Sequence, residues 1–207
     1  MAIKNHLQIL ESGIDNWNDW QKAHPEITPD LTEADLVQAN LGGADLGEVK
    51  LRGANLAESD LTMANLRGAD LTGAFLGGVF LASANLAGAD LSEATMHAAN
   101  LPAATLRWAN LNRADLTGAN LSGANLSGAQ LRGANMEAVI LDETVLVFTD
   151  LSETRGLDSC HHLGESGIDF NTLMRSWPLP KGFLRGLGLP DAYIKEIPEL
   201  IVKVRSI

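Results

Sequence analysis

A repeat of five residues runs through most of this chain and constrains its fold more than any other feature. Every fifth position from 31 to 151 is leucine or methionine, with Leu at 23 of the 25 positions and the exceptions at Met96 and Met136. The residue two places earlier is small, and it is alanine at 18 of the 24 positions from 34 to 149. Asp or Asn mostly stands between the two, and glycine follows two places after the leucine in ten units. The unit therefore reads Ala-(Asp/Asn)-Leu-x-Gly.

A period of five residues fits neither a regular α-helix nor a flat β-strand. In a helix of 3.6 residues per turn, leucines five apart would wind around the axis by about 140° per step. In a strand, whose side chains alternate with a period of two, successive leucines would fall on opposite faces. A chain that turns a corner once in each unit brings every leucine to the same side. The x-Gly pair suits such a turn, because glycine readily adopts a positive φ.

Tandem units of this kind resemble the pentapeptide-repeat family. The resemblance covers residues 30–153 without an insertion. It implies an all-β solenoid, a right-handed quadrilateral β-helix with four units in each coil. The repeats then make about six coils and a rod roughly 30 Å long, at the usual spacing of about 4.8 Å between strands. Residues 20 apart in the sequence are expected to stack on one face, with the leucines inside.

The open ends of a solenoid need covers, so we expect short α-helical caps at both ends. Residues 1–29 are the expected N-terminal helical cap. Asp15 is expected to cap a second short helix, which carries Trp17 and Trp20. This helix should stop near Pro25. We expect the tryptophans to pack against the first coil, with ligand stacking as the alternative. The apolar residues with helical spacing at the start of the chain are Ile3, Leu7, Leu10 and Ile14.

Residues 154–207 are the expected C-terminal helical segment. Asp169 is expected to cap one helix, which runs through Met174. A second should begin near Pro180 and a third at Pro190. The repeat fades after position 137, and we expect the C-terminal segment to pack on the apolar residues that appear there, which are Val139, Ile140, Val145, Val147 and Phe148.

A second resemblance lies within this C-terminal segment. Residues 167–191 resemble the segment that, in multidomain bacterial pentapeptide-repeat proteins, joins the solenoid to a Toll/interleukin-1-receptor-type signalling domain. Ile207 ends the chain about where such a domain would begin. The resemblance implies that the solenoid is part of a bacterial signalling protein, but it assigns no residue of a signalling domain.

The charge of the chain excludes several classes of partner. The chain holds 26 acidic and 15 basic residues, for a formal net charge of -11. We therefore expect no direct binding to nucleic-acid phosphates and no binding to an anionic membrane. No run of 18 apolar residues occurs, so no transmembrane helix is expected. The single cysteine and the lack of an apolar leader at the N-terminus favour the cytoplasm.

We find no candidate catalytic, cofactor-binding or metal-binding residues in the sequence. The tightest cluster of metal-capable side chains is Cys160, His161 and His162. Adjacent residues rarely point at one ion, so a structural or solvated role is favoured over a metal site. No phosphate-binding loop, dinucleotide fingerprint or nucleophile elbow occurs. We predict no cofactor and no enzymatic activity, and an enzyme is the remotest alternative.

The predicted function is a non-enzymatic scaffold for protein–protein interaction, with an unidentified protein partner and self-association as a further expectation. Phe75 and Phe80 occupy positions that usually hold Asp or Asn, and Trp108 occupies a usual glycine position. Exposed aromatic residues on a rigid surface are candidate anchors for a partner. Scattered surface apolar residues are the alternative. The coil neighbours of Trp108 are Gly88 and Gly128, so its indole is expected to lie flat on that face.

The main alternative is a DNA mimic that inhibits DNA gyrase, as some pentapeptide-repeat proteins do. Residues 30–153 carry 16 acidic and 6 basic residues, which invites the comparison. Columns of residues 20 apart argue against a continuous acidic stripe, because most columns mix Asp with uncharged residues. Asp70 over Asp90 is the exception, where two carboxylates are neighbours in one column. Asn100 over Asn120 predicts an amide ladder instead. No phenylalanine occupies the central position, as it often does in gyrase-directed members of the family.

Overall fold

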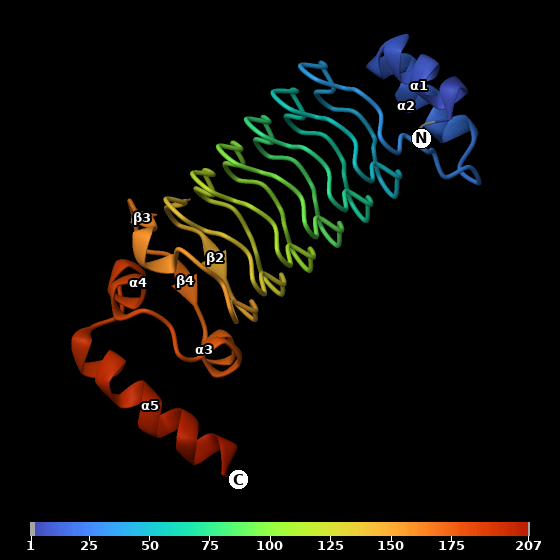
Figure 1. Cartoon of the computed structure of the whole chain (residues 1–207). Coiled ribbons are helices and arrows are strands. Elements are labelled where there is room, and N and C mark those ends of the chain that lie inside the picture. Colours follow the sequence, from blue (N-terminus) through green and yellow to red (C-terminus); the bar gives the residue numbers. More distant parts are fainter. Residues whose placement is uncertain (1–2, 207) are drawn as a thin grey trace.

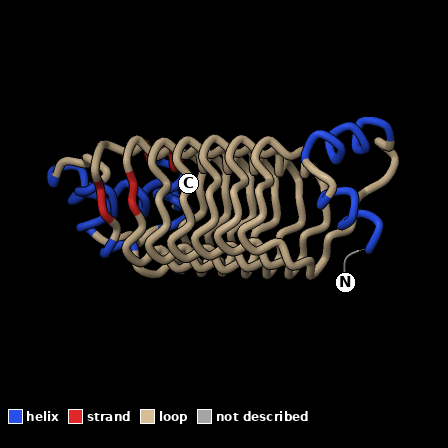
Figure 2. The backbone as a smooth tube through the Cα atoms, turned by 90° about the horizontal axis from the view of Figure 1, so that it is seen from above, coloured by secondary structure: helices blue, strands red, loops and turns tan. Residues whose placement is uncertain are grey.

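The computed structural model describes residues 3–206 and shows a solenoid with helices at both ends (Figure 1). The coils stack in a single row, which is clearest from above (Figure 2). Two helices precede the coils and three follow them, with a short 3-10 turn at Leu157–Ser159. The helices are α1 (Lys4–Glu11), α2 (Ile14–Ala23), α3 (Phe170–Ser176), α4 (Lys181–Gly186) and α5 (Asp191–Arg205).

Parallel β-bridges join residues that lie 20 places apart. They begin with Asp30 and Lys50 and continue at every fifth residue to Asn135 and Arg155. Each bridge is flanked by backbone hydrogen bonds, such as the one from the Leu31 N–H to the Lys50 oxygen at 2.7 Å. The predicted stacking of residues 20 apart is therefore confirmed.

The bridges form four columns, and each column runs along one face of the solenoid. Each face consists of the residues directly before and after the central leucines of one column. The residue two places after the leucine stands at the corner that leads to the next face. We number the faces by the residues that start their columns: face 1 at Asp30, face 2 at Asp35, face 3 at Asn40 and face 4 at Asp45.

The core is built from the central leucines and the small residues that precede them. All 25 central residues are buried, and the most exposed of them, Leu36, has only 6% of its surface accessible. The burial of each central leucine stabilises the folded state by about 1.5–3 kcal/mol, before the entropy cost of ordering the chain is subtracted.

The chain turns on both sides of each bridge, so most bridges are one residue long. The described residues form only four longer strands, β1 (Ile140–Leu141), β2 (Val145–Leu146), β3 (His161–His162) and β4 (Gly167–Ile168).

The turn of each unit has the same backbone conformation whether or not it contains glycine. All 25 residues two places after a central leucine or methionine have a φ between 49° and 74°. Ten of them are glycine, and the other fifteen include Trp108 and Phe148. Most of these turns are closed by a hydrogen bond from the next small residue, as from the Ala34 N–H to the Leu31 oxygen at 3.0 Å. The Thr144 and Thr149 N–H groups instead donate to the side chains of Ser166 and Thr172. The predicted turn is confirmed, and it is imposed even where the side chain disfavours it.

Helices α1 and α2 lie against the first coils. Trp17 is fully buried, and its indole Nε1 donates a hydrogen bond of 2.6 Å to the Asp45 oxygen. The prediction that Asp15 caps α2 is wrong. The N-cap is Gly13, whose φ of 119° reverses the chain directly before Ile14, so α2 begins earlier and Asp15 falls in its first turn. Trp20 is half-buried and stacks against His24.

The C-terminal segment continues the solenoid for two short strands before it becomes helical. Strand β3 pairs with β1 and β4 pairs with β2, both in parallel. Helix α3 is capped by Asp169, which accepts a hydrogen bond of 2.9 Å from the Thr172 N–H. Helices α4 and α5 follow Pro180 and Pro190, so all three predicted helix starts are confirmed. Phe148 remains 45% exposed, so the segment does not cover it fully.

Candidate functional site

The register of the coils separates charges that are mixed along the sequence. Within residues 30–153, faces 2 and 3 and the corners that follow them carry no lysine or arginine. All six cations of this region lie on faces 1 and 4 or their corners, namely Lys50, Arg52, Arg67, Arg107, Arg113 and Arg132. Faces 2 and 3 and the corners that follow them hold seven carboxylates, namely Asp35, Glu58, Asp60, Asp115, Glu137, Asp142 and Glu143. The next cation along face 2 is Arg155, at the C-terminal end of its column.

Two exposed phenylalanines stand on these two adjoining faces, in the same coil. Phe75 lies on face 2 between Asn55 and Thr95, and it is 54% exposed. Phe80 lies on face 3 and is 48% exposed. Both side chains leave a rigid, hydrogen-bonded backbone, so they are held outward without loop flexibility. The predicted anchors are therefore brought to either side of one corner of the solenoid.

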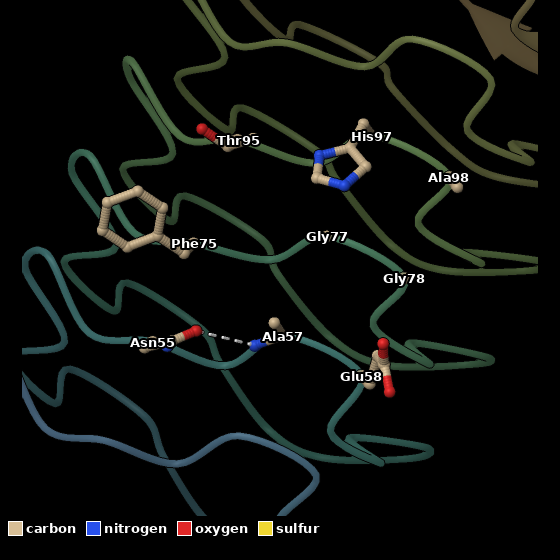
Figure 3. A pocket seen from close by; sticks show the side chains of 9 residues that line it. All are labelled: Asn55, Ala57, Glu58, Phe75, Gly77, Gly78, Thr95, His97 and Ala98. Carbon is tan, nitrogen blue, oxygen red and sulfur yellow. Dashed lines mark hydrogen bonds between the residues drawn. The ribbon is translucent and has the colours of Figure 1, made fainter.

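A shallow groove accompanies each phenylalanine. The groove on face 2 has a volume of about 550 Å³. Phe75, Gly77 and Gly78 line it from one coil, and His97 lines it from the next (Figure 3). The groove on face 3 has a volume of about 440 Å³ and is lined by Phe80 and Asp60. Glu58 lines both grooves from the corner between them. We call Phe75, Phe80, Glu58 and these two grooves the corner site.

Two glycines make room in the corner site for side chains from the neighbouring coils. A side chain at Gly77 would collide with the His97 ring, which lies directly over that glycine. The Glu58 side chain lies over Gly78 in the same way, with its Cγ 3.5 Å from the position that a Cβ would take. The Gln38 amide holds the Glu58 carboxylate in place with a hydrogen bond of 2.8 Å. Sequence reasoning missed Glu58 and His97, although the 20-residue register places both beside the phenylalanines.

The second groove contains a carboxylate that is held in its charged form. Hydrogen bonds from the Thr62 side chain and backbone lower the pKa of Asp60 below its usual value. The backbone bond runs from the Thr62 N–H to Asp60 Oδ1 at 2.9 Å. Asp60 therefore stays negative over the whole range in which proteins usually work.

Trp108 does not belong to the corner site. It stands at the corner that follows face 4 and is 61% exposed. Its indole lies over Gly128, which is buried beneath it, while nothing approaches Gly88. The indole thus lies over a glycine neighbour that has no side chain, as the sequence predicts.

Cys160, His161 and His162 do not converge on a common point. Cys160 Sγ contacts the Met136 oxygen at 3.4 Å, and burial raises the pKa of its thiol to about 12. Neighbouring residues of strand β3 point to opposite sides, so His161 is exposed while His162 packs against Phe183. Within residues 3–206, no group of three metal-capable side chains is placed to hold an ion.

Asparagine side chains bond from coil to coil at several places on the outer surface. Asn120 Nδ2 donates to Asn100 Oδ1 at 3.2 Å, as the stacking of these residues predicts. Other rungs end on carboxylates, such as the bond from Asn110 Nδ2 to Asp90 Oδ1 at 3.0 Å. Several aspartates therefore serve the coil-to-coil hydrogen bonding of the solenoid itself.

A family model described as pentapeptide repeats matches this chain over residues 30–68, 64–102, 99–137 and 119–155. These segments together cover more than half of the chain. The chain belongs to the pentapeptide-repeat family. Its members are generally non-catalytic structural or interaction proteins. The matched region ends at residue 155, so it lends no support to the resemblance of residues 167–191 to a signalling linker.

Two solved structures of pentapeptide-repeat proteins share about a third of their aligned residues with this chain. HetL from the cyanobacterium Nostoc sp. strain PCC 7120, involved in regulating heterocyst differentiation, is 36% identical over 64% of this chain, with a TM-score of 0.41. The match spans only 63% of HetL. A protein from the thylakoid lumen of Arabidopsis thaliana is 34% identical over 48% of this chain and 69% of its own, with a TM-score of 0.47.

The likeness in structure is greater for a third protein of lower identity. A trypsin-treated variant of QnrB1, a plasmid-mediated fluoroquinolone resistance protein, is 18% identical over 77% of this chain and 84% of its own, with a TM-score of 0.58. The family match and the similarity to QnrB1 indicate a right-handed β-helix solenoid. A search of curated proteins gives no match. No helix within residues 3–206 is long and apolar enough to cross a membrane.

Proposed function

We propose that this protein is a non-enzymatic scaffold that docks a protein partner on the corner site. The observation that carries this proposal is the pair of half-exposed phenylalanines on two adjoining faces without cations. A rigid surface loses little conformational entropy on binding, so even a small apolar patch contributes useful affinity. Aromatic side chains flanked by polar groups are typical of the energetic centres of protein interfaces.

The domain organisation supports this role. We propose a solenoid of about six coils over residues 30–153, closed by helical caps in residues 1–29 and 154–207. The contact of Trp17 with the Asp45 oxygen supports the first cap. The hydrogen bond of 2.7 Å from Thr172 Oγ1 to the Leu146 oxygen supports the second. Caps of this kind keep the ends from associating and leave the faces for partners.

An affinity capture experiment tests the scaffold function. Tagged protein is compared with a Phe75→Ala/Phe80→Ala variant as bait in an extract of the native host. We expect a partner whose recovery falls severalfold with the variant, because both anchors are lost. A Trp108→Ala variant is the matched control, since it removes an exposed aromatic residue from another corner. Equal recovery with all three baits would contradict docking at the corner site.

A DNA mimic that inhibits DNA gyrase is the second candidate. The observation in its favour is that two adjoining faces of residues 30–153, with the corners that follow them, hold seven carboxylates and no lysine or arginine. The amide ladders count against it, because neutral asparagine side chains stand between the carboxylates along the columns and interrupt a continuous row of negative charge. A supercoiling assay distinguishes the candidates, since inhibition of gyrase at micromolar protein or below favours mimicry.

Three further aspects of the function are proposals that follow from the sequence. We place the protein in the bacterial cytoplasm and regard self-association as a second mode of assembly, which analytical ultracentrifugation tests. A role in positioning signalling domains follows from the resemblance of residues 167–191. Sequencing the gene beyond codon 207 tests that role, because it shows whether a signalling domain is encoded there.

A further inference from the structure

We propose that His162 is a pH-sensitive latch, which holds helix α4 on the solenoid while its imidazole is neutral and releases the helix in mild acid. This inference goes beyond the proposed function, because it concerns the C-terminal cap and not the corner site. Its structural basis is the place of one imidazole ring between the last strands of the solenoid and α4. Figure 1 shows α4 beside strand β3, which carries His162.

The imidazole of His162 forms part of the contact between α4 and the solenoid. Its ring packs against Phe183 of α4, with 5.5 Å between the ring centroids. It also lies over Gly186 of the same helix, where a side chain would collide with the ring. Phe183 is fully buried in this contact region. A change in the chemistry of the imidazole therefore acts directly on the packing of α4.

Strand pairing fixes the backbone that carries this ring. His162 pairs with Leu141 of β1 in a parallel register. The His161 N–H donates a hydrogen bond of 2.8 Å to the Val139 oxygen, and the Leu163 N–H donates one of 2.9 Å to the Leu141 oxygen. Hydrogen bonds thus hold β3 on both sides of His162, whereas α4 contacts the imidazole by packing alone. We therefore expect α4, and not β3, to move when the imidazole changes its charge.

Both ring nitrogens of His162 are buried without a hydrogen bond. Neither Nδ1 nor Nε2 has a partner among the described residues. A neutral imidazole leaves one donor and one acceptor unpaired there, whereas an imidazolium would leave two donors and a positive charge unpaired. Burying an unpaired charge costs far more than burying a neutral polar group. A protonated His162 therefore needs water, and displacement of α4 admits it.

The charges around the ring do not offset this cost. Strand β1 contributes only apolar residues. The titratable or charged side chains on the other neighbouring segments are His161 on β3, Asp142 directly after β1, Asp158 in the 3-10 turn, and Lys181 and Arg185 on α4. The Asp142 carboxylate lies against Gly164, and Arg185 pairs with Asp191 at 2.7 Å. Burial, with a smaller effect from the charge of His161, lowers the pKa of His162 below its ordinary value of 6.5.

Acid weakens the latch because a released imidazole takes up a proton that the buried imidazole disfavours. The pKa of His162 returns toward 6.5 when α4 is displaced, and it is lower while α4 is in place. The neutral imidazole therefore favours the attached state. Attachment has its full strength well above pH 6.5 and weakens as the pH falls through this value.

Amide hydrogen exchange of the full chain measures the release. Protection factors, which correct for the pH dependence of exchange itself, are compared at about pH 7.5 and about pH 5.5. We expect the opening of α4 to increase by up to about tenfold at the lower pH, because a released histidine of ordinary pKa is about nine-tenths protonated there. The bridges of the repeat should keep their protection. Unchanged protection of α4 would overturn the proposal.

Variants assign the response to one side chain. His162→Leu removes the titratable group and both unpaired nitrogens, so α4 should open equally at the two pH values. His162→Gln is a polar alternative that is also uncharged at every pH, and it should likewise abolish the response. His161→Gln is the matched control on the exposed side of the same strand, and it should retain the response. A pH response that persists in both His162 variants would assign it to another group.

Nuclear magnetic resonance of the histidine rings gives a readout that a purely structural role would not move. We expect the His162 ring to remain neutral in the attached state as the pH falls below 6.5. Titration of this ring at its ordinary pKa while α4 stays protected would overturn the proposal. The corner site keeps all its residues in these variants, so a His162→Leu bait should recover the same host partner at neutral pH. The latch and the scaffold function are thus tested separately.

Discussion

At the scale of the residue, the turn position shows how the fold overrides local preference. A left-handed backbone is unfavourable by about 1–2 kcal/mol for a residue with a side chain. Fifteen units nevertheless place such a residue there, including Ala98 with a φ of 53°. The buried leucines and the bridges on either side hold the turn, so their combined energy exceeds the strain. Glycine is thus preferred at this position but not required.

Gly118 and Ala98 test this balance, because they stand in one column in successive coils. Gly118 has a φ of 67°, and a Cβ there would meet nothing within 4 Å, so Gly118→Ala introduces backbone strain without a clash. We expect the variant to lose about 1 kcal/mol of unfolding free energy. Ala98→Gly should leave the unfolding free energy unchanged or raise it, because it removes the strain at that turn. Urea unfolding measures both changes, and a Gly118→Ala variant as stable as the parent would contradict the strain.

At the scale of the element, helix α3 is attached to the solenoid through Asp169. Burial alone would raise the pKa of this carboxyl. Hydrogen bonds from the Thr172 side chain and from the Phe148 and Thr172 backbone outweigh burial and lower the pKa to about 2. The same carboxylate therefore caps α3 and bonds the last part of the solenoid, at 3.0 Å from the Phe148 N–H. Charge on Asp169 holds the two elements together.

This attachment should weaken in acid. The pKa of Asp169 is lower in the folded protein than the ordinary value of 3.8, so ionised Asp169 favours the folded state. Its contribution is complete above pH of about 4 and is lost as the pH falls from there toward 2. Amide hydrogen exchange of α3 measured across this range should show the loss. Asp169→Asn should remove the pH dependence, and a variant with the same acid response as the parent would exclude this carboxyl as its source.

At the scale of the whole molecule, stacking identical units brings like charges close together. The formal net charge is -11, and Asp70 lies directly over Asp90 in one column of bridges. Exposed ion pairs such as Arg113–Glu93 offset little of the repulsion between these like charges, because water and salt screen the pairs. Self-repulsion is therefore a general destabilising contribution in this rod.

Salt should stabilise the protein as a result. Raising the salt concentration from about 0.05 M to about 0.5 M shortens the screening length, so that charges separated by several coils no longer repel each other appreciably. We expect Tm to rise by a few degrees, measured by circular dichroism. Sodium chloride and potassium chloride should act alike if screening is the cause. A fall in Tm would mean that the ion pairs outweigh the repulsion.

The sequence alone determined the inward leucines and the turns, because one residue pattern recurs every five positions and a turn in each unit brings its leucines to one side. The 20-residue register followed from the resemblance to the pentapeptide-repeat family, with four units in each coil. It also identified Phe75 and Phe80 as exposed and predicted the caps of the C-terminal helices from Asp169 and two prolines. It misplaced the start of α2, since the reversal at Gly13 depends on how two helices pack against the first coil.

Only the tertiary structure decided which residues form the corner site. Phe75 and Phe80 are brought to either side of one corner by the turn at Gly78, and Glu58 joins them from the preceding coil. The same coiling sends every cation of residues 30–153 to the other two faces and corners. Neither grouping is visible along the chain, because side chains 17 to 22 residues apart become neighbours only when the backbone completes a 20-residue coil.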